Sequence, residues 1–562
     1  MRRIGEKGAG LDAPIIIVGA GPVGLALAAD LGWMGVRTLI VDQGAGGIPQ
    51  PKTSGVNMRT MEFCRRWGLK EKIRSKGLAK DFQRDRIWVT SLTGYEIARK
   101  KGPSLADDIA PLGAIETFMR IHQTEFDPIL RDFILSCPSI TALYHTRCTA
   151  VEQDADGVTA TLADVDSGAT ETVRAKYLVS CEGAGSLIRK ALGVRLEGNW
   201  EVNNSTNAYF RSSQFLSIHD KGEGLIYGVI QPDGYRGYIF AINGTDLWQA
   251  QIRGLGNEKP TSSPDEVATI IRQFVGRDFE FELLNVMPWT RRQLLADHYQ
   301  KGRIFLAGDA IHQMPPSGTL GMNTGVADAT NLSWKLAAVL AGWGGDSLLD
   351  TYESERRPIA DYNAKASTRL FHSTQVKVPP GPVILEDTTE GERARAQLGV
   401  QLLQSAVSES TEGLQIGYCY EDSPICLSGK ETAWTASNIY KPTTRPGARA
   451  PDAWIKEGDP LLDHFGRGFV LVRLGKEPPE TKTLEAAAVA RSVPVTVLDI
   501  RDRQIEELYE RRLVLVRPDG HVAWRGDDPP SNPLTLIDTI RGARSPAMAL
   551  AASARDAENA TG

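Results

Sequence analysis

The chain of 562 residues is longer than one hydrophobic core usually supports, so we expect two or three domains. With 41% hydrophobic residues, 24% charged residues and a net charge of -5, the composition is that of a water-soluble globular protein, and it argues against nucleic acid or membranes as partners. No apolar run reaches the roughly 20 residues that span a bilayer, and the N-terminus lacks the apolar stretch of a signal peptide. The six cysteines lack CxxC or metal-ligand spacing, so we expect free thiols, no metal and a cytoplasmic location.

The first elements form a predicted βαβ unit. Residues 15–19 (IIIVG) are an apolar run of strand length, an Ala- and Leu-rich helix follows the glycine turn, and residues 38–41 are a second buried strand. Gly19, Gly21 and Gly24 form GxGxxG, the pattern that brings a pyrophosphate close to the backbone at a helix N-terminus. Asp42 ends the second strand, where an acid binds an unphosphorylated ribose. The unit predicts a site for FAD or NAD, which the fingerprint alone does not distinguish.

A different pattern, the alternation of polar and apolar residues, runs from about residue 203 to residue 252. Short segments such as NAYFRSS, GLIYGVI and LWQAQI are separated by the turn sequences PDG and NGT. This pattern predicts an antiparallel sheet.

The stretch 308–325, GDAIHQMPPSGTLGMNTG, overlaps the end of a further predicted buried strand, GRIFLAG. Asp309 follows that strand, at the end where α/β proteins bind ligands, and its carboxylate can accept hydrogen bonds from ribityl hydroxyls. Pro315 and Pro316 remove two N–H donors and leave carbonyl oxygens as the polar atoms of the loop. A second ligand loop so far from the first suggests a long cofactor contacted from two places, which favours FAD.

The rest of this loop also fits a flat ring. Glycines at positions 318, 321 and 325 allow close approach of the backbone. A helix predicted from about residue 322 to 341 would direct the positive end of its dipole at a ring that becomes an anion. We expect His312 to pack or to hydrogen-bond within the loop, because no triad or metal set surrounds it.

A Pro/Gly-rich segment at residues 441–454 predicts a domain boundary. Beyond it, FVLVRLG, VPVTVLDI and LVLVRPDGHVAWRG are the predicted strands of a small α/β domain. The Ala- and Ser-rich tail at residues 546–562 is predicted to be disordered.

With both loops in view, the sequence resembles the FAD-dependent aromatic hydroxylases, the group A flavoprotein monooxygenases. Three family motifs have counterparts: GxGxxG at 19–24, the GD motif at 302–336 and the DG motif LVSCEGAGSLIRKALG at 178–193. In the DG motif Glu182 stands where the family usually has Asp, and Arg189 matches the family's arginine. In the GD motif Thr319 and Leu320 replace a common Gly-Gln, and side chains there could narrow the flavin's freedom to move.

The resemblance implies an α/β fold with three domains. An FAD-binding Rossmann-like domain of the glutathione reductase type comprises residues 14–80, 111–200 and 291–440. A substrate domain with the antiparallel sheet comprises residues 81–110 and 201–290. Residues 441–545 resemble the thioredoxin-like C-terminal domain of the phenol hydroxylase branch. No cysteine follows Cys426, so that domain cannot perform dithiol chemistry and is expected to have a structural or interaction role.

The same resemblance implies an activity. NAD(P)H reduces FAD, O2 adds to form a flavin C4a-hydroperoxide, and one oxygen atom is transferred to a small phenol-type aromatic substrate. NAD(P)H is expected to dock transiently, since no second GxGxxG is present. A homodimer is expected.

Site residues follow from the motifs and from the predicted sheet, which should cover the substrate. The expected cofactor-binding residues are Gly19, Gly21, Pro22, Val23, Gly24, Asp42, Gln43, Arg59, Gln123, Thr149, Glu182, Gly183, Gly308, Asp309, Pro316, Gly318, Gly321, Met322 and Asn323, with Lys52 near the phosphates. The sheet offers Tyr209, Arg211, Tyr227, Tyr238 and Trp248 as pocket candidates. We predict catalytic roles for Tyr227, a hydroxyl among apolar neighbours, for Arg211, and for the Pro316 carbonyl, which can accept a hydrogen bond from the peroxide or substrate.

Other functions stay open at this stage. A Baeyer–Villiger oxygenase would share the fold and differ in attacking a carbonyl. A flavin halogenase is disfavoured by the absence of WxWxIP. A nicotinamide-only dehydrogenase is the alternative if no flavin binds, and a non-catalytic FAD-binding redox sensor or scaffold is the alternative outside enzymes.

Overall fold

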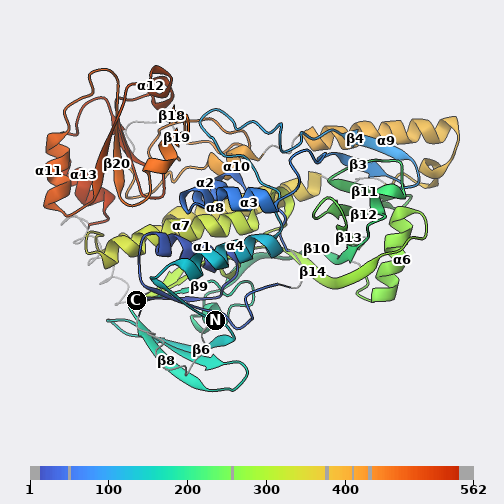
Figure 1. Cartoon of the computed structure of the whole chain (residues 1–562), viewed down its shortest axis with the longest axis horizontal. Helices are drawn as coiled ribbons and strands as arrows, with labels where there is room; N and C mark the ends of the chain where they lie inside the picture. Colours follow the sequence, from blue (N-terminus) through green and yellow to red (C-terminus); the bar gives the residue numbers. More distant parts are fainter. Residues whose placement is uncertain are drawn as a thin grey trace, which may run out of the picture.

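The computed structural model describes residues 13–48, 52–254, 259–373, 379–407, 411–427 and 433–543. Figure 1 shows an α/β body in the centre, a lobe built on a second sheet to its right, and a C-terminal α/β domain at the upper left. The tail predicted to be disordered lies outside the described residues.

The body is built on a six-stranded sheet with the order β15-β16-β9-β1-β2-β5. Its parallel strands are β1 (Ile15–Val18), β2 (Thr38–Val41), β5 (Ile140–Leu143), β9 (Tyr177–Ser180) and β16 (Ile304–Leu306), with β15 (Gln300–Lys301) antiparallel at the edge. Helix α1 (Pro22–Trp33) joins β1 to β2, which confirms the predicted βαβ unit. The fingerprint turn therefore lies at the carboxyl ends of the parallel strands, where open α/β sheets bind ligands.

Helices and a small sheet complete the body. Helix α1 packs against α4 (Gln123–Ser136) and α7 (Gly321–Leu340), and α7 packs against α8 (Thr351–Ser373). The shorter helices are α2 (Met58–Arg66), α3 (Lys70–Lys76), α5 (Leu187–Ala191) and α10 (Glu412–Ile416). Strands β6 (Thr146–Gln153), β7 (Val158–Asp164) and β8 (Thr170–Ala175) form a three-stranded sheet at the bottom of Figure 1. Helix α7 spans nearly the range that the sequence predicts.

The lobe contains an eight-stranded sheet with the order β17-β14-β10-β13-β12-β11-β3-β4. Its strands are β3 (Arg86–Val89), β4 (Glu96–Lys100), β10 (Leu196–Arg211), β11 (Ile226–Gln231), β12 (Gly234–Ala241), β13 (Leu247–Arg253), β14 (Glu282–Ala296) and β17 (His312–Gln313). The predicted antiparallel sheet is confirmed across β10 to β13, and one parallel pair joins β11 to β3.

Each face of this sheet has its own environment, because side chains alternate along a strand. Helix α6 (Pro264–Val275) packs Val267, Ile271 and Phe274 on one face, against alternate residues of β13 such as Trp248 and Ala250. Helix α9 (Thr389–Val407) packs against β4. The opposite face is turned to a cavity shared with the body.

The C-terminal domain has the order β20 (Phe469–Leu474), α11 (Lys482–Ala490), β21 (Val495–Ile500), α12 (Arg503–Tyr509), β22 (Leu513–Val516), β23 (Val522–Gly526) and α13 (Pro533–Ile540). Its sheet has the strand order β21-β20-β22-β23, in which only β20 and β21 are parallel. Before it, β18 (Trp454–Lys456) pairs with β19 (Asp459–Pro460). Phe469 of this domain packs on Trp334 of α7, with ring centroids 6.1 Å apart, so the domain shares a hydrophobic core with the body.

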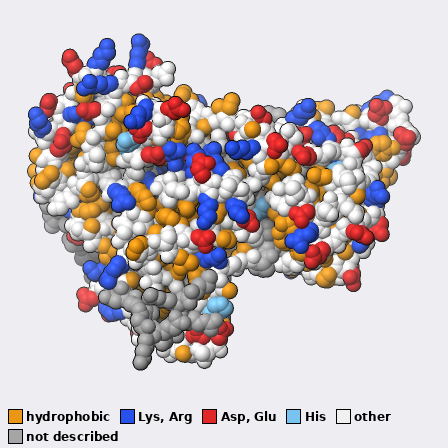
Figure 2. Space-filling model, viewed as in Figure 1, with side chains coloured by type: hydrophobic (Ala, Val, Ile, Leu, Met, Phe, Trp, Pro, Cys, Tyr) orange, Lys and Arg blue, Asp and Glu red, His pale blue; other side chains and the backbone are white. Residues whose placement is uncertain are grey.

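On the face shown in Figure 2, basic and acidic side chains are interspersed rather than gathered by sign. This distribution agrees with the near-neutral composition and offers no single-sign surface to a polyanion. Among the described helices, none is both long and apolar enough to cross a bilayer.

Candidate active site

One cavity of about 1420 Å³ lies between the carboxyl ends of the body's parallel strands and the inner face of the eight-stranded sheet. Typical ligand pockets measure roughly 300–1,000 Å³, so this space accommodates more than one small molecule. The two halves of the cavity come from different domains and have different side chains.

The fingerprint turn forms one wall of the body half. Gly19, Gly21, Pro22 and Val23 line the cavity. A Cβ placed on Gly21 would meet nothing within 4 Å, so the backbone there is open to a ligand. Gly24 does not line the cavity; a Cβ on it would lie 1.9 Å from the Gly19 carbonyl oxygen, so this glycine serves the close packing of α1 on the turn.

Asp42 lies at the end of β2, beside the fingerprint turn, and lines the cavity with Gln43. Its carboxylate accepts hydrogen bonds from the backbone N–H groups of Ala20 (2.6 Å) and Gly44 (2.7 Å). These bonds fix the acid at the rim, while each carboxylate oxygen keeps a lone pair for a ribose hydroxyl.

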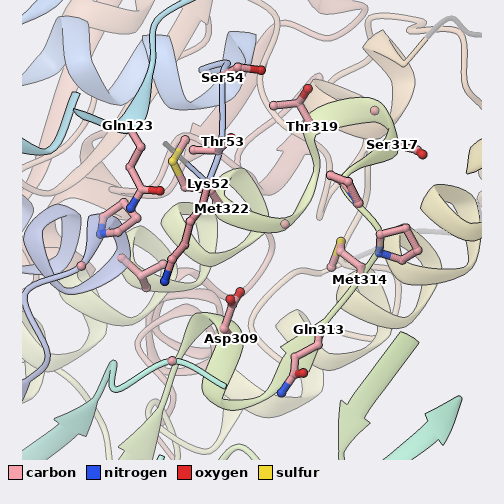
Figure 3. Close-up of a pocket in the computed structure, with 18 of the residues that line it drawn as sticks. Lys52, Thr53, Ser54, Gln123, Asp309, Gln313, Met314, Ser317, Thr319 and Met322 are labelled. Atoms are coloured by element: carbon pink, nitrogen blue, oxygen red, sulfur yellow. The ribbon is translucent and has the colours of Figure 1, made fainter. Parts of the chain in front are cut away.

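The second wall combines segments from three parts of the chain. Figure 3 shows Lys52, Gln123 and Asp309 directed toward one space, from the loop after β2, the start of α4 and the turn after β16. Asp309 accepts no hydrogen bond from the described residues, and burial raises the pKa of its carboxyl group despite the opposing charges of His312 and Lys52. This acid therefore presents unused acceptors to the cavity.

Two helix N-termini supply donors. Helices α1 and α7 begin at Pro22 and Gly321, both cavity residues, and neither start has a side-chain cap among the described residues. Uncapped N-termini carry free N–H groups and partial positive charge, which suit a pyrophosphate at one and an anionic ring edge at the other. The exposed glycine backbone, the carboxylate acceptors and the N–H donors at the two helix starts thus fit flavin adenine dinucleotide.

The comparisons with known proteins bear on this fit. A family model described as FAD binding domain matches residues 12–367, and one described as aromatic-ring hydroxylase, C-terminal, matches residues 443–545. The chain belongs to the FAD-binding aromatic-ring hydroxylases. It is an FAD-dependent monooxygenase.

Similar proteins cover nearly the whole chain. A putative polyketide hydroxylase from Streptomyces halstedii is 31% identical over 92% of this chain and 94% of its own length. The solved structure of the rebeccamycin biosynthetic enzyme RebC with reduced flavin matches with a TM-score of 0.88 and 35% identity, covering 95% of this chain and 99% of that one. A ternary complex of aklavinone-11 hydroxylase with FAD and aklavinone matches with a TM-score of 0.79 and 26% identity, covering 94% and 99%.

The DG-motif acid lies at the edge of the FAD site. Glu182 and Gly183 line the cavity. One Glu182 carboxylate oxygen accepts hydrogen bonds from the hydroxyls of Ser180 (2.9 Å) and Ser186 (2.7 Å) and from the Ile188 backbone N–H (3.1 Å). Glu182 therefore braces the start of α5 at the cavity wall.

The loop between η2 (Gly308–Ala310) and α7 lines the cavity with Pro316, Gly318 and Thr319, and the first residues of α7, Gly321 and Met322, line it as well. The Pro316 carbonyl already accepts the Thr319 N–H at 3.0 Å and keeps one lone pair. Thr319 has φ 56, a left-handed conformation that is uncommon for a β-branched residue and stores about 1–3 kcal/mol of strain. Leu320 instead packs in a hydrophobic cluster, so only Thr319 of the two departures from the family pattern lines the cavity.

Several expected cofactor residues lie behind the cavity rather than in it. Asn323 donates to the carbonyls of Gly55 (3.2 Å) and Thr319 (2.7 Å) and so braces the loop. A Cβ on Gly308 would lie 2.9 Å from Val23, so this glycine permits close packing.

Two other cofactor predictions do not agree with the positions observed. Arg59 is buried away from the cavity, where it hydrogen-bonds to Glu62 at 2.6 Å and to the Asp519 carbonyl of the C-terminal domain. Thr149 is exposed on β6 and donates to the Thr161 carbonyl at 3.2 Å, while its neighbours Thr146 to Cys148 line the cavity.

The catalytic prediction for Tyr227 conflicts with its position. Tyr227 points to the α6 face of the sheet, where its hydroxyl donates to the Gly222 carbonyl at 2.6 Å and burial raises its pKa. Tyr238 lies opposite Gly228 in the next strand, one position out of phase, and its side chain lines the cavity. Because side chains alternate between the two faces of the sheet, Tyr238 lies on the cavity face, where the sequence predicts Tyr227.

The remaining sheet candidates also lie outside the cavity. Arg211 is exposed and forms ion pairs with Asp246 (3.3 Å) and Glu282 (3.1 Å). Trp248 is in the core and donates to the Ser212 carbonyl, and Tyr209, which pairs with Gln249, is partly buried and does not line the cavity. His312 is buried and hydrogen-bonds at 2.6 Å to Asp328 of α7, outside its own loop, as a packing residue rather than a cavity residue.

Sequence reasoning missed a polar wall on the inner face of the sheet. This wall contains Asn207, Gln249, Gln251, Arg253, Trp289 and Arg291. The signal was present in LWQAQIR, where Gln249, Gln251 and Arg253 alternate with the core residues of β13. Such alternation usually marks a solvent-facing side, and here it marks an enclosed one.

Proposed function

We propose that this monooxygenase hydroxylates a phenol-type aromatic substrate, with NAD(P)H as reductant and O2 as oxygen donor. The observation that carries the proposal is the single cavity shared by the fingerprint turn, the GD loop and the inner face of the sheet. One ligand alone would leave much of its 1420 Å³ empty. A cofactor in the body half and an aromatic substrate in the sheet half would share one enclosed space.

The body half would hold FAD. When bound, FAD supplies the redox chemistry with NAD(P)H and O2 that inserts one oxygen atom into an aromatic ring. We assign the pyrophosphate to the start of α1, the ribose to Asp42, and ribityl hydroxyls to Asp309. The free N–H groups at the start of α7 would stabilise negative charge at the ring edge, a preorganised electrostatic contribution.

The sheet half would hold the substrate. Tyr238, Phe240 and Trp289 offer aromatic surfaces, and the remaining lone pair of the Pro316 carbonyl offers an acceptor at the junction of the two halves. We propose that Tyr238 hydrogen-bonds to the substrate hydroxyl. The named relatives act on polyketides or bind aklavinone, which supports a substrate larger than one ring.

We also infer that the C-terminal domain is thioredoxin-like and has a structural role. The strand order β21-β20-β22-β23, with one parallel pair and helices between the strands, supports this assignment. The shared core with α7 supports a structural role, since dithiol chemistry needs cysteines that this domain lacks.

The proposed function is tested with purified protein, FAD, NADH or NADPH, and a panel of phenols of one to four rings. We expect flavin absorbance bands, phenol-stimulated NAD(P)H oxidation and a hydroxylated product. Aromatic ketones are added to the panel, and a lactone or ester product from them would indicate a Baeyer–Villiger oxygenase. Bound FAD with only hydrogen peroxide as product would indicate a sensor or scaffold.

A pair of tyrosine variants tests the substrate half. Tyr238→Phe should lower kcat/KM by roughly 3- to 10-fold, the value of one neutral hydrogen bond. Tyr227→Phe, one position out of phase on the neighbouring strand, should leave kcat/KM unchanged. Equal effects from the two variants would contradict the assignment of Tyr238.

A further inference from the structure

The sheet half of the cavity is rich in arginine. Arg120, Arg253 and Arg291 line it, and Asp108, the carboxylate that acts on Arg120, is already paired with Arg84. Burial and neighbouring arginines lower the pKa of Arg120 to about 10 and that of Arg291 to about 9. Arginine side chains are therefore concentrated in this half of the cavity.

Arg253 of β13 is the clearest case. Its side chain is only 8% exposed, yet it donates no hydrogen bond to any described residue, and its Nε and Nη1 atoms are buried without an acceptor. Its guanidinium lies 4.5 Å from the Tyr235 ring centroid and 5.2 Å from that of Phe371. These ring contacts compensate part of the charge but leave the N–H groups unsatisfied.

Arg291 of β14 is held in place by neutral groups. It is 2% exposed and donates to Ser205 (2.6 Å), Gln251 (2.6 Å) and Asn203 (2.9 Å), while its buried Nε finds no acceptor. No described carboxylate lies within ion-pair distance of Arg291 or Arg253.

The two guanidinium groups belong to one site. Both contact the ring of Phe371, Arg291 at 4.8 Å and Arg253 at 5.2 Å, and the charge of Arg253 lowers the pKa of Arg291. Two like charges held together in a buried wall destabilise the free protein unless an anion joins them. The planar guanidinium fork matches a carboxylate, which it can bind through two parallel hydrogen bonds.

We propose that the aromatic substrate carries a carboxylate, which Arg253 and Arg291 bind on the inner face of the sheet. This inference deepens the proposed function and rests on it. Aromatic walls beside the arginines favour an aromatic acid over a nicotinamide pyrophosphate as the anion: the Trp289 ring centroid lies 4.4 Å from the Arg291 guanidinium, and the Phe371 ring contacts both arginines. The bound anion would offset the positive charge that Arg253 and Arg291 place in this wall.

The test uses the FAD-loaded full-length protein and matched pairs of ligands. Benzoate, 4-hydroxybenzoate and 6-hydroxy-2-naphthoate are titrated against their primary amides, and binding is followed by the change in flavin absorbance. We expect each acid to bind at least about 30-fold more tightly than its amide, the ratio for a buried charge pair. Arg253→Gln and Arg291→Gln should each weaken acid binding by about 30-fold and leave amide binding within threefold.

The control is an arginine of the same sheet that lies outside the cavity. Arg211→Gln, an exposed arginine in strand β10 of the same sheet, should change neither affinity. Equal binding of acids and amides, or no acid binding at millimolar concentration, would overturn the proposal, as would variants that raise only the KM for NAD(P)H. If neutral phenols are hydroxylated as well as the acids, the proposed function stands and this inference fails; if no oxygenated product forms from any ligand, the proposed function itself fails.

Discussion

Buried charges in this protein form two contrasting groups, one at the boundary between the body and the C-terminal domain and one around the cavity. At the boundary, Glu355 of α8 accepts from Lys335 (2.7 Å) and Arg517 (2.6 Å), and Glu62 of α2 pairs with Arg59 and Arg449. At the cavity, the buried side chains of Arg253 and Arg291 lack a counter-ion within hydrogen-bonding distance among the described residues, and so does the carboxylate of Asp309, which is exposed to the cavity.

The two groups use buried charged residues for different purposes. A buried carboxylate that pairs with two cations stabilises the contact between domains. At Glu355 these cations, Arg517 and Lys335, outweigh the effect of burial, so the pKa of its carboxyl group is lowered. A buried ionisable group without a partner destabilises the free protein and is retained where a ligand completes it. Breaking the first group should harm stability, and breaking the second should harm binding.

The largest expected effect is that of Glu355→Ala. Removing this acid leaves Lys335 and Arg517 buried without their shared carboxylate, which should lower the free energy of unfolding by about 3–5 kcal/mol. Urea unfolding followed by tryptophan fluorescence measures the change. Glu507→Ala, which removes an exposed pair with Arg503, is the control and should leave the urea midpoint unchanged. A small effect of Glu355→Ala would contradict a fastening role.

The next effect concerns cofactor binding at the cavity. Asp309→Ala should raise the Kd of FAD by roughly 10- to 100-fold, because hydrogen bonds to a carboxylate contribute about 1.5–3 kcal/mol. Titration of the apoprotein, followed by flavin fluorescence, measures the Kd, and the urea midpoint of the apoprotein should not fall. An unchanged Kd would remove Asp309 from the FAD site.

A smaller effect should appear as a pH dependence. Asp127 of α4 is buried beside Gln123 (3.0 Å), and burial raises its pKa from its usual 3.8 to about 7. The folded protein therefore binds more protons than the unfolded chain between about pH 4 and pH 7, so the stability that Asp127 contributes is present at low pH and is lost as the pH rises.

The variant Asp127→Asn tests this pH dependence of stability. The variant should gain stability relative to the natural protein as the pH rises from 5 to 7, by about 1.4 kcal/mol per pH unit at most. Urea midpoints at the two pH values give the difference, with Asp132→Asn on the same helix as the control for a lost surface charge. A difference that does not vary with pH would show that Asp127 is ionised throughout.

The smallest effect is that of Arg253→Met, which is compared with the same substitution at Arg517 in the other region. Arg253→Met keeps the apolar stem and removes an unpaired charge, so it should leave stability unchanged or raise it by about 1 kcal/mol. Arg517→Met removes a paired charge and should destabilise as strongly as Glu355→Ala. Similar losses for both arginines would mean that Arg253 has a structural partner.

The sequence predicts the elements whose signal is local. The βαβ unit, helix α7 and the antiparallel sheet follow from periodicity and glycine spacing, and Asp42 and Asp309 lie at the cavity because the ends of parallel strands meet at one edge. These patterns depend on residues that are close together in the chain, so they can be recognised in the sequence alone.

The residues that the sequence misassigns depend on which side of an element faces the cavity. Tyr227 and Tyr238 occur in similar strands, and only the pairing register places one on each face. Arg59 is an expected cofactor residue, yet it contacts Asp519, which is 460 positions away along the chain, because the C-terminal domain covers it. Long-range packing determines which of these side chains face the cavity, and a local sequence pattern does not predict that packing.

The central claim, that the protein inserts one oxygen atom from O2 into an aromatic ring, is tested most directly with isotopically labelled oxygen. The FAD-loaded protein is incubated with NAD(P)H, ¹⁸O2 and either a phenol or a hydroxylated aromatic acid. The mass of the product is then measured by mass spectrometry. We predict a hydroxylated product that contains one ¹⁸O atom. Consumption of NAD(P)H with hydrogen peroxide as the sole oxygen product, across the whole panel of aromatic compounds, would contradict the account.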